Sequence, residues 1–194
     1  DSLTLQKMFY QMAKEKVECV VMEVSSQSLK LDRVAGCHFD IALFTNFSED
    51  HISPKEHPDM EDYFASKLKL FEMCKTGIVN ADDLQSAKIP RLFPDSNIVT
   101  YGIDNFANVL AKDITITNSY VDFRVKITDR NERVKTGIPG RFSVYNALAA
   151  ICVAQKFGIS SEIVKQALEE GKIHPVRYKN YLENYNELKD KRRY

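Results

Sequence analysis

Two short apolar runs, each followed at once by polar residues, constrain the fold of this chain more than any other feature. Residues 19–22 (Cys-Val-Val-Met) are followed by Glu23, and residues 41–44 (Ile-Ala-Leu-Phe) are followed by Thr45 and Asn46. Such runs are typical of strands that are buried on both faces of a parallel sheet. In open α/β sheets, ligands bind outside the carboxyl ends of the strands. We therefore predict a binding site formed by the polar residues that follow these two strands.

A helix is predicted over residues 60–74, with Asp59 as its N-cap. Lys67 lies inside this helix, and its neighbours three and four residues away are apolar or aromatic: Tyr63, Phe64, Leu70 and Phe71. Burial lowers the pKa of a lysine, and the neutral amine can add to carbon dioxide to give a carbamate that binds magnesium. The alternative is a lysine whose stem packs while its ammonium reaches water. Position alone favours this alternative.

The hydrophobic period changes between about residues 108 and 138. Apolar residues alternate with polar ones around residues 114–116, 121–127 and 134–138, and turn-forming residues separate the three stretches. This pattern predicts an antiparallel meander with one wet face. Helices are predicted over residues 142–157 and 161–170. The fold class is therefore α/β, with a mostly parallel sheet flanked by helices and a small antiparallel β meander.

The composition excludes several classes of protein. The 194-residue chain has a formal net charge of zero, which disfavours binding to nucleic acid or to an anionic membrane surface. No apolar run approaches the roughly 20 residues that a membrane span needs. Cys19, Cys74 and Cys152 lie in apolar patterns without Cys-x-x-Cys spacing, so we expect reduced core thiols and a cytoplasmic location.

Three ordered segments resemble the central, ATP-binding domain of the Mur ligases. They are residues 22–36 (beginning Met-Glu-Val-Ser-Ser-Gln-Ser-Leu), residues 44–51 (Phe-Thr-Asn-Phe-Ser-Glu-Asp-His) and the helix with Lys67. The resemblance extends from residue 1 to about residue 171 and is strongest to members that add the third residue of the peptidoglycan stem peptide. It implies an ATP- and Mg²⁺-dependent amide ligase that joins an amino acid to UDP-MurNAc-dipeptide through an acyl phosphate.

The resemblance also implies a metal site. The family residues that match Glu23 and His51 help to hold magnesium, and the one that matches Lys67 is carbamylated and assists a second metal. We therefore expect Glu23, His51 and Lys67 to be metal ligands, and His51 and carbamylated Lys67 to act in catalysis. With the resemblance added, the carbamate is favoured over the solvent-reaching lysine.

Four further residues are expected to bind substrates. The family residues that match Ser25 and Arg33 contact the muramoyl peptide. Asn46 and Asn146 are expected to bind the nucleotide, because a family asparagine near the nucleotide matches Asn146. Without the resemblance, ordinary turn and surface roles would be preferred for Ser25 and Arg33.

The chain is expected to be a fragment. In the family, a phosphate loop lies upstream of the segment that matches residues 1–3, and the chain contains no Gly-x-x-x-x-Gly-Lys-[Ser/Thr] motif. We expect residues 1–175 to form a partial central domain and residues 176–194 a polar tail. Without the phosphate loop and the domain that recruits the amino acid, the chain is predicted to be inactive alone.

Two other functions remain open from the sequence. One is a related ligase of the same superfamily, of the folylpolyglutamate or cyanophycin synthetase type. The other is a catalytically inactive interaction module.

Overall fold

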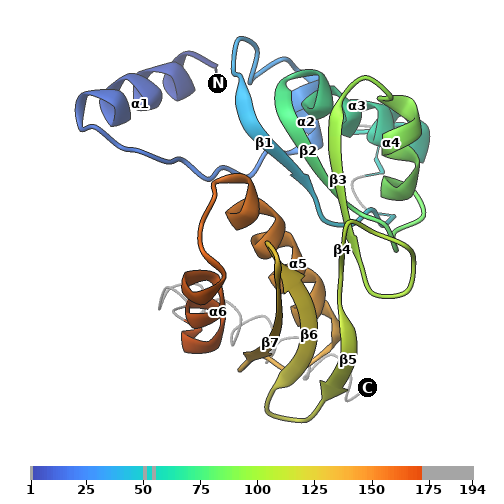
Figure 1. Cartoon of the computed structure of the whole chain (residues 1–194). Helices are drawn as coiled ribbons and strands as arrows, with labels where there is room; N and C mark the ends of the chain where they lie inside the picture. Colours follow the sequence, from blue (N-terminus) through green and yellow to red (C-terminus); the bar gives the residue numbers. More distant parts are fainter. Residues whose placement is uncertain (1, 50–51, 54–55, 172–194) are drawn as a thin grey trace, which may run out of the picture.

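A four-stranded parallel sheet forms the upper half of the molecule in Figure 1, and its strands follow one another in chain order, β1-β2-β3-β4. The computed structural model describes residues 2–49, 52–53 and 56–171. The elements of this half are α1 (Ser2–Lys14), α2 (Ser26–Lys30), β1 (Phe39–Phe44), α3 (Met60–Glu72), β2 (Cys74–Asn80), a 3-10 turn (Ser86–Lys88), α4 (Ile89–Leu92), β3 (Asn97–Gly102) and β4 (Val109–Leu110). The predicted parallel sheet is confirmed.

The two faces of this sheet are covered by different helices. Ile78 and Val79, neighbours on β2, are both fully buried but belong to different apolar clusters, because successive strand residues point to opposite faces. Ile78 packs in the cluster that contains the buried residues of α5 (Arg141–Lys156), and Val79 packs with Phe71 of α3 and Ile89 of α4. Burial on both faces explains why Ile78 and Val79 are both apolar although they point to opposite sides.

Gly77 lets α3 approach the sheet closely. A Cβ built on Gly77 would lie 2.5 Å from Cδ1 of Ile98 and 2.8 Å from the ring of Phe71. Any larger residue at this position would force the helix or the neighbouring strand to move.

The antiparallel meander is also confirmed. It consists of β5 (Lys112–Ile116), β6 (Val121–Ile127) and β7 (Arg130–Thr136), and α5 and α6 (Ser161–Glu170) pack with it. The alternating residues of β6 are buried, with Phe123 and Ile127 fully so. One boundary differs from the prediction, because residues 109–110 pair with β3 as β4 and thus extend the parallel sheet.

The predicted strand at residues 19–22 is wrong. Residues 17–25 have no regular secondary structure, and Figure 1 shows an extended connection from α1 towards α2. Val21 is 95% exposed and Cys19 is exposed, so Cys19 is not a core thiol; Cys37, by contrast, is buried. An extended apolar segment becomes a buried strand only where a neighbouring strand pairs with its backbone, and among the described residues none does so here.

Among the described helices, none combines the length and apolar character that a membrane crossing requires. The predicted tail at 176–194 lies outside the described residues. The division into a domain of residues 1–175 and a tail stays a prediction.

Candidate functional site

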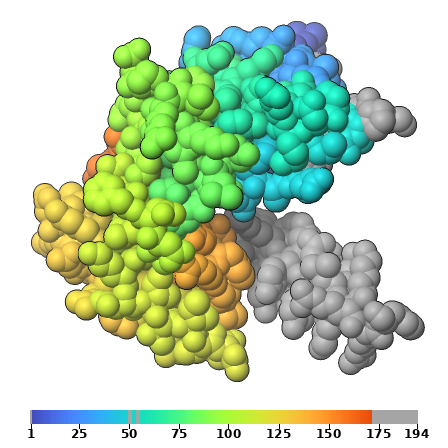
Figure 2. Space-filling model, turned by 90° about the vertical axis from the view of Figure 1, so that its right-hand side faces the viewer, coloured from blue at the N-terminus to red at the C-terminus, as the bar shows by residue number. Residues whose placement is uncertain are grey.

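A pocket of about 240 Å³ lies at the carboxyl ends of the parallel strands, where the sequence predicts a site. It is lined by residues at or just after the ends of β1, β2 and β3 and by the first turns of α5: Thr45, Asn46, Asn80, Asp82, Asp83, Tyr101, Phe142, Tyr145 and Asn146. The structure thus brings together Asn46 and Asn146, which lie 100 positions apart in the sequence. Figure 2 shows the orange atoms of α5 next to the green atoms of the strand ends.

Two acids after β2 hold the rim of this pocket. Asp83 accepts a hydrogen bond from the backbone N–H of Phe47, after β1, at 3.0 Å, and two more from N–H groups of its own turn. Asp82 accepts hydrogen bonds from the backbone N–H groups of Ile103 at 2.6 Å and Asn105 at 2.7 Å, in the loop after β3. The pair therefore fastens the ends of three strands to one another.

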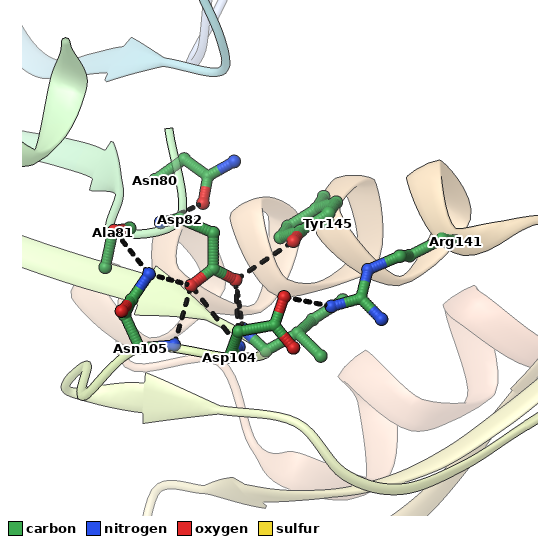
Figure 3. Close-up of polar contacts among 8 residues, drawn as sticks. Asn80, Ala81, Asp82, Asp104, Asn105, Arg141 and Tyr145 are labelled. Carbon is green, nitrogen blue, oxygen red and sulfur yellow. Dashed lines mark hydrogen bonds and ion pairs between the residues drawn. The ribbon is translucent and has the colours of Figure 1, made fainter. Parts of the chain in front are cut away.

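Asp82 also connects the strand ends to α5. The hydroxyl of Tyr145 donates to Oδ2 of Asp82 at 3.0 Å, and Arg141 forms an ion pair with Asp104 beside it (Figure 3). Partial burial acts to raise the pKa of Asp82, but the hydrogen bonds from the 103–105 loop and from Tyr145 outweigh it and hold this pKa below its usual range. Burial, aided by the bond to Asp82, raises the pKa of Tyr145, with Arg141 opposing. The pocket therefore presents an ionised carboxylate and a neutral phenol.

A second polar cluster joins α2 to α3. His57 is fully buried; its Nδ1 lies 2.6 Å from Oδ2 of Asp62, on α3, and its Nε2 lies 2.9 Å from Oγ of Ser26, on α2. Lys30, at the other end of α2, donates to Asp62 Oδ2 at 2.6 Å. The hydrogen bond from Lys30, and then that from His57, lowers the pKa of Asp62, so this carboxylate is ionised at neutral pH.

The two predicted substrate contacts lie at α2. The hydroxyl of Ser25 caps the helix by accepting a hydrogen bond from the N–H of Ser28 at 3.1 Å, and its side chain is exposed. Arg33 is exposed in the turn after α2, where its backbone N–H donates to the carbonyl of Ser28 at 2.8 Å. Both side chains are therefore accessible, and their contact with the muramoyl peptide stays a prediction.

The three predicted metal ligands are described only in part. Glu23 is exposed, two residues before the cap of α2, and His51 lies outside the described residues. Lys67 is half-buried on α3, with Nζ 5.0 Å from the ring centroid of Tyr63 and 5.8 Å from that of Phe44. The expected aromatic environment is present, although ring faces at this distance favour the charged ammonium.

The described residues contain no group of three or more His, Cys, Asp or Glu side chains that could hold a metal ion. A carboxylate at Glu23 and a carbamate at Lys67 would supply the oxygen ligands that magnesium prefers, and Glu23 is accessible. The donor chemistry therefore fits magnesium. Convergence of these residues on one ion stays a prediction.

Sequence reasoning missed the roles of His57 and Asp82. In the sequence, His57 lies in a polar loop and Asp82 in a segment typical of turns, so neither stands out. The hydrogen-bond partner of His57 on α2 lies 31 residues away, and the N–H donors of Asp82 lie 21–23 residues away. The Asn-Ala-Asp-Asp segment directly after a strand was the only available signal for Asp82.

The fold agrees with comparisons to known proteins. Residues 1–154 match the Mur ligase middle domain. The chain is 47% identical over 181 residues to a UDP-N-acetylmuramoyl-L-alanyl-D-glutamate–2,6-diaminopimelate ligase of Caldanaerobacter subterraneus, covering 91% of this chain and 37% of that protein. A ligase of the same name from Bacillus velezensis is 39% identical over 196 residues, with 96% of this chain and 39% of that protein covered.

A solved structure of a diaminopimelate ligase with this name superposes with a TM-score of 0.78 at 26% identity, covering 87% of this chain and 35% of that one. The chain thus spans well under half the length of the relatives it matches. The family match nevertheless covers most of the chain, from its first residue into α5. The chain belongs to the Mur ligase family, and its parallel sheet with the pocket at the strand ends is the middle domain of that family.

Proposed function

We propose that this chain is the nucleotide-binding middle part of an ATP-dependent ligase that adds diaminopimelate to UDP-MurNAc-dipeptide in the cytoplasm. The observation that carries this proposal is the 47% identity over nearly the whole chain to a ligase of that name. The pocket at the strand ends supports it, because ligands of open α/β sheets bind there.

In the proposed reaction, the γ-phosphate of ATP moves to the terminal carboxylate of the dipeptide, which gives an acyl phosphate and ADP. The amine of diaminopimelate then attacks the acyl carbon, an amide bond forms and phosphate leaves. Phosphoryl transfer depends mostly on positioning and on neutralising charge. Magnesium, when bound, would supply that neutralisation.

Within this scheme, the residues of the chain bind and orient. Asn46, after β1, and Asn146, in α5, both line the pocket and offer amide donors and acceptors to the nucleotide. Arg33 offers a guanidinium to the carboxylate or phosphate groups of the muramoyl peptide. Glu23, His51 and carbamylated Lys67 would hold magnesium.

The test uses the full-length ligase that contains this segment. We expect ATP-dependent formation of the tripeptide from UDP-MurNAc-dipeptide and diaminopimelate, and no reaction when a folate replaces the muramoyl substrate. The variants Asn46→Ala and Asn146→Ala should raise the KM for ATP, whereas Arg33→Ala should raise the KM for the muramoyl peptide. Asn131→Ala, on the exposed edge of the meander, is the matched control and should change neither.

The 194-residue chain alone should form no amide, because the phosphate loop and the amino-acid domain are not in its sequence. A full-length protein that makes no tripeptide, or a lone chain that does, would refute the proposal. Nucleotide binding without any amide formation by the full-length protein would favour an inactive interaction module.

A further inference from the structure

His57 is a fully buried histidine that joins two elements on which predicted site residues lie. Its two ring nitrogens are both used: Nε2 faces Ser26 at 2.9 Å and Nδ1 faces Asp62 at 2.6 Å. A buried polar side chain that satisfies both neighbours is costly to remove, because each neighbour then loses its partner.

The proton positions follow from the chemistry of the two partners. The ionised carboxylate of Asp62 can only accept, so Nδ1 of His57 carries the proton and donates it. In this tautomer Nε2 carries no proton and can only accept, so the hydroxyl of Ser26 donates to it. The chain of donors runs in one direction, from α2 through His57 to α3.

Both ends of α2 are thereby attached to the same carboxylate. Ser26 reaches Asp62 through His57, and Lys30 reaches it directly at 2.6 Å. Further along α3, the ammonium of Lys69 donates to the carbonyl of Leu29 at 3.2 Å. These contacts fix the position and the rotation of α2 against α3.

The same histidine also lies near the surroundings of Lys67. The rings of His57 and Tyr63 are 5.1 Å apart between centroids, and the Nζ of Lys67 lies 5.0 Å from the centroid of Tyr63. The ring of Phe47 stacks on Tyr63 at 4.7 Å. A shift of the His57 ring would therefore change the packing at α2 and around Lys67.

We propose that His57 is a positioning residue of the ligase, which holds the substrate-side segment at α2 in a fixed place against the α3 helix that carries Lys67. This inference rests on the proposed function, because it assigns Ser25 and Arg33 to the muramoyl substrate and Lys67 to the metal side. His57 touches neither substrate; it acts through Ser26 and Asp62.

The same three side chains have the order of a nucleophile, a base and an orienting acid, but their burial argues against covalent catalysis. Ser26 is 5% exposed and His57 is fully buried. A substrate carbonyl would need to come within about 3–3.5 Å of the hydroxyl oxygen, and the packing of α2 on α3 occupies that space. A positioning role uses the hydrogen bonds without requiring access.

The test compares two variants that remove the same hydrogen bond in the full-length ligase. His57→Asn retains a donor near the position of Nδ1 but does not reach Ser26, and Ser26→Ala removes the hydroxyl. Each variant should raise the KM for UDP-MurNAc-dipeptide about tenfold, which corresponds to about 1.4 kcal/mol. The KM for ATP should stay within about twofold, since the strand-end pocket is held by other residues.

The double variant should be no worse than either single variant, because both act on one contact. His38→Asn is the matched control, since His38 is exposed, and it should change neither the KM for UDP-MurNAc-dipeptide nor the KM for ATP. The tautomer is an independent readout: ¹⁵N spectra of the imidazoles in the 194-residue chain should show His57 protonated at Nδ1, and this signature should weaken in Asp62→Asn.

Unchanged KM values in folded variants, additive effects in the double variant, or a proton at Nε2 would each overturn the inference. If His57→Asn does not fold, the KM values of Ser26→Ala and the ¹⁵N spectrum of His57 in the wild type test the inference. A full-length wild type that makes no tripeptide would instead refute the proposed function, and the tautomer readout would still test the link between α2 and α3.

Discussion

Replacing Asp82 with asparagine tests whether this carboxylate holds the strand ends together. Oδ1 accepts from the backbone N–H of Asn105 at 2.7 Å and from its side-chain amide at 3.0 Å, while Oδ2 accepts from Ile103, Asp104 and Tyr145 at 2.6, 3.1 and 3.0 Å. The asparagine side chain keeps one acceptor oxygen. In its best orientation it keeps the Oδ2 contacts and turns its amide towards the donors of Asn105.

At least two hydrogen bonds to a charged acceptor are therefore lost. Each contributes a net 1.5–3 kcal/mol or so, and partial exposure of Asp82 favours the lower end of that range. We expect Asp82→Asn to lower the free energy of unfolding by about 3 kcal/mol. Urea unfolding followed by far-UV circular dichroism measures this change, because the chain has no tryptophan to report it by fluorescence.

The matched control is Asp104→Asn, which makes the same chemical change in the adjoining loop. Asp104 is exposed and pairs with Arg141, and an exposed pair contributes less than about 1 kcal/mol. Equal destabilisation by the two substitutions would refute the reasoning, because the hydrogen bonds of Asp82 would then contribute no more than an exposed ion pair.

Acid adds a second readout for Asp82. Because its folded pKa is depressed, its contribution is fully present above the unfolded value of about 3.9 and is lost as the pH falls through the folded pKa. The difference between the wild type and Asp82→Asn should therefore be constant from about pH 5 upwards and should narrow below about pH 4. A difference that stays constant in acid would show that the effect is not electrostatic.

Two further predictions test the packing of the sheet and the burial of the thiols. Gly77→Ala should lower the free energy of unfolding, measured in urea, by about 1–3 kcal/mol, because the new Cβ would lie 2.5 Å from a neighbouring side-chain atom. The control is Gly137→Ala, whose Cβ would have no atom within 4 Å, and it should lower the free energy of unfolding far less. A thiol reagent at pH 8 should label the exposed Cys19 first and Cys152 last, because burial raises the pKa of the Cys152 thiol to about 12. Peptide mapping by mass spectrometry gives the order of labelling. Early labelling of Cys152 would contradict its burial.

The parallel sheet and the meander were predictable because their patterns are local. The run at residues 41–44 and the alternation at residues 121–127 each carry the period of the strand that they form. Asp59 was predictable as a cap for the same reason, since its acceptor role depends on a donor three residues away. Residues 19–22 carry a similar apolar signal and are nevertheless extended and exposed, because a strand also needs a partner that the local sequence does not specify.

From local pattern alone, the candidate site was predictable only where it follows the strands; Asn146, on α5, was expected from the family resemblance. Asn46 comes directly after β1, so its place at the pocket follows from the general rule for α/β sheets. The link through His57 depends on the packing of α2 against α3. Such a contact leaves no mark on the residues beside the histidine, and only the three-dimensional structure reveals it.

The chain order of the parallel strands has a consequence for synthesis on the ribosome. Because β1, β2, β3 and β4 lie side by side in the order in which they are made, each new strand meets an edge that has already formed. No strand has to insert between two others that are already paired. The described sheet can therefore grow in one direction as the polypeptide emerges, so that only one incomplete edge at a time awaits its next neighbour during translation.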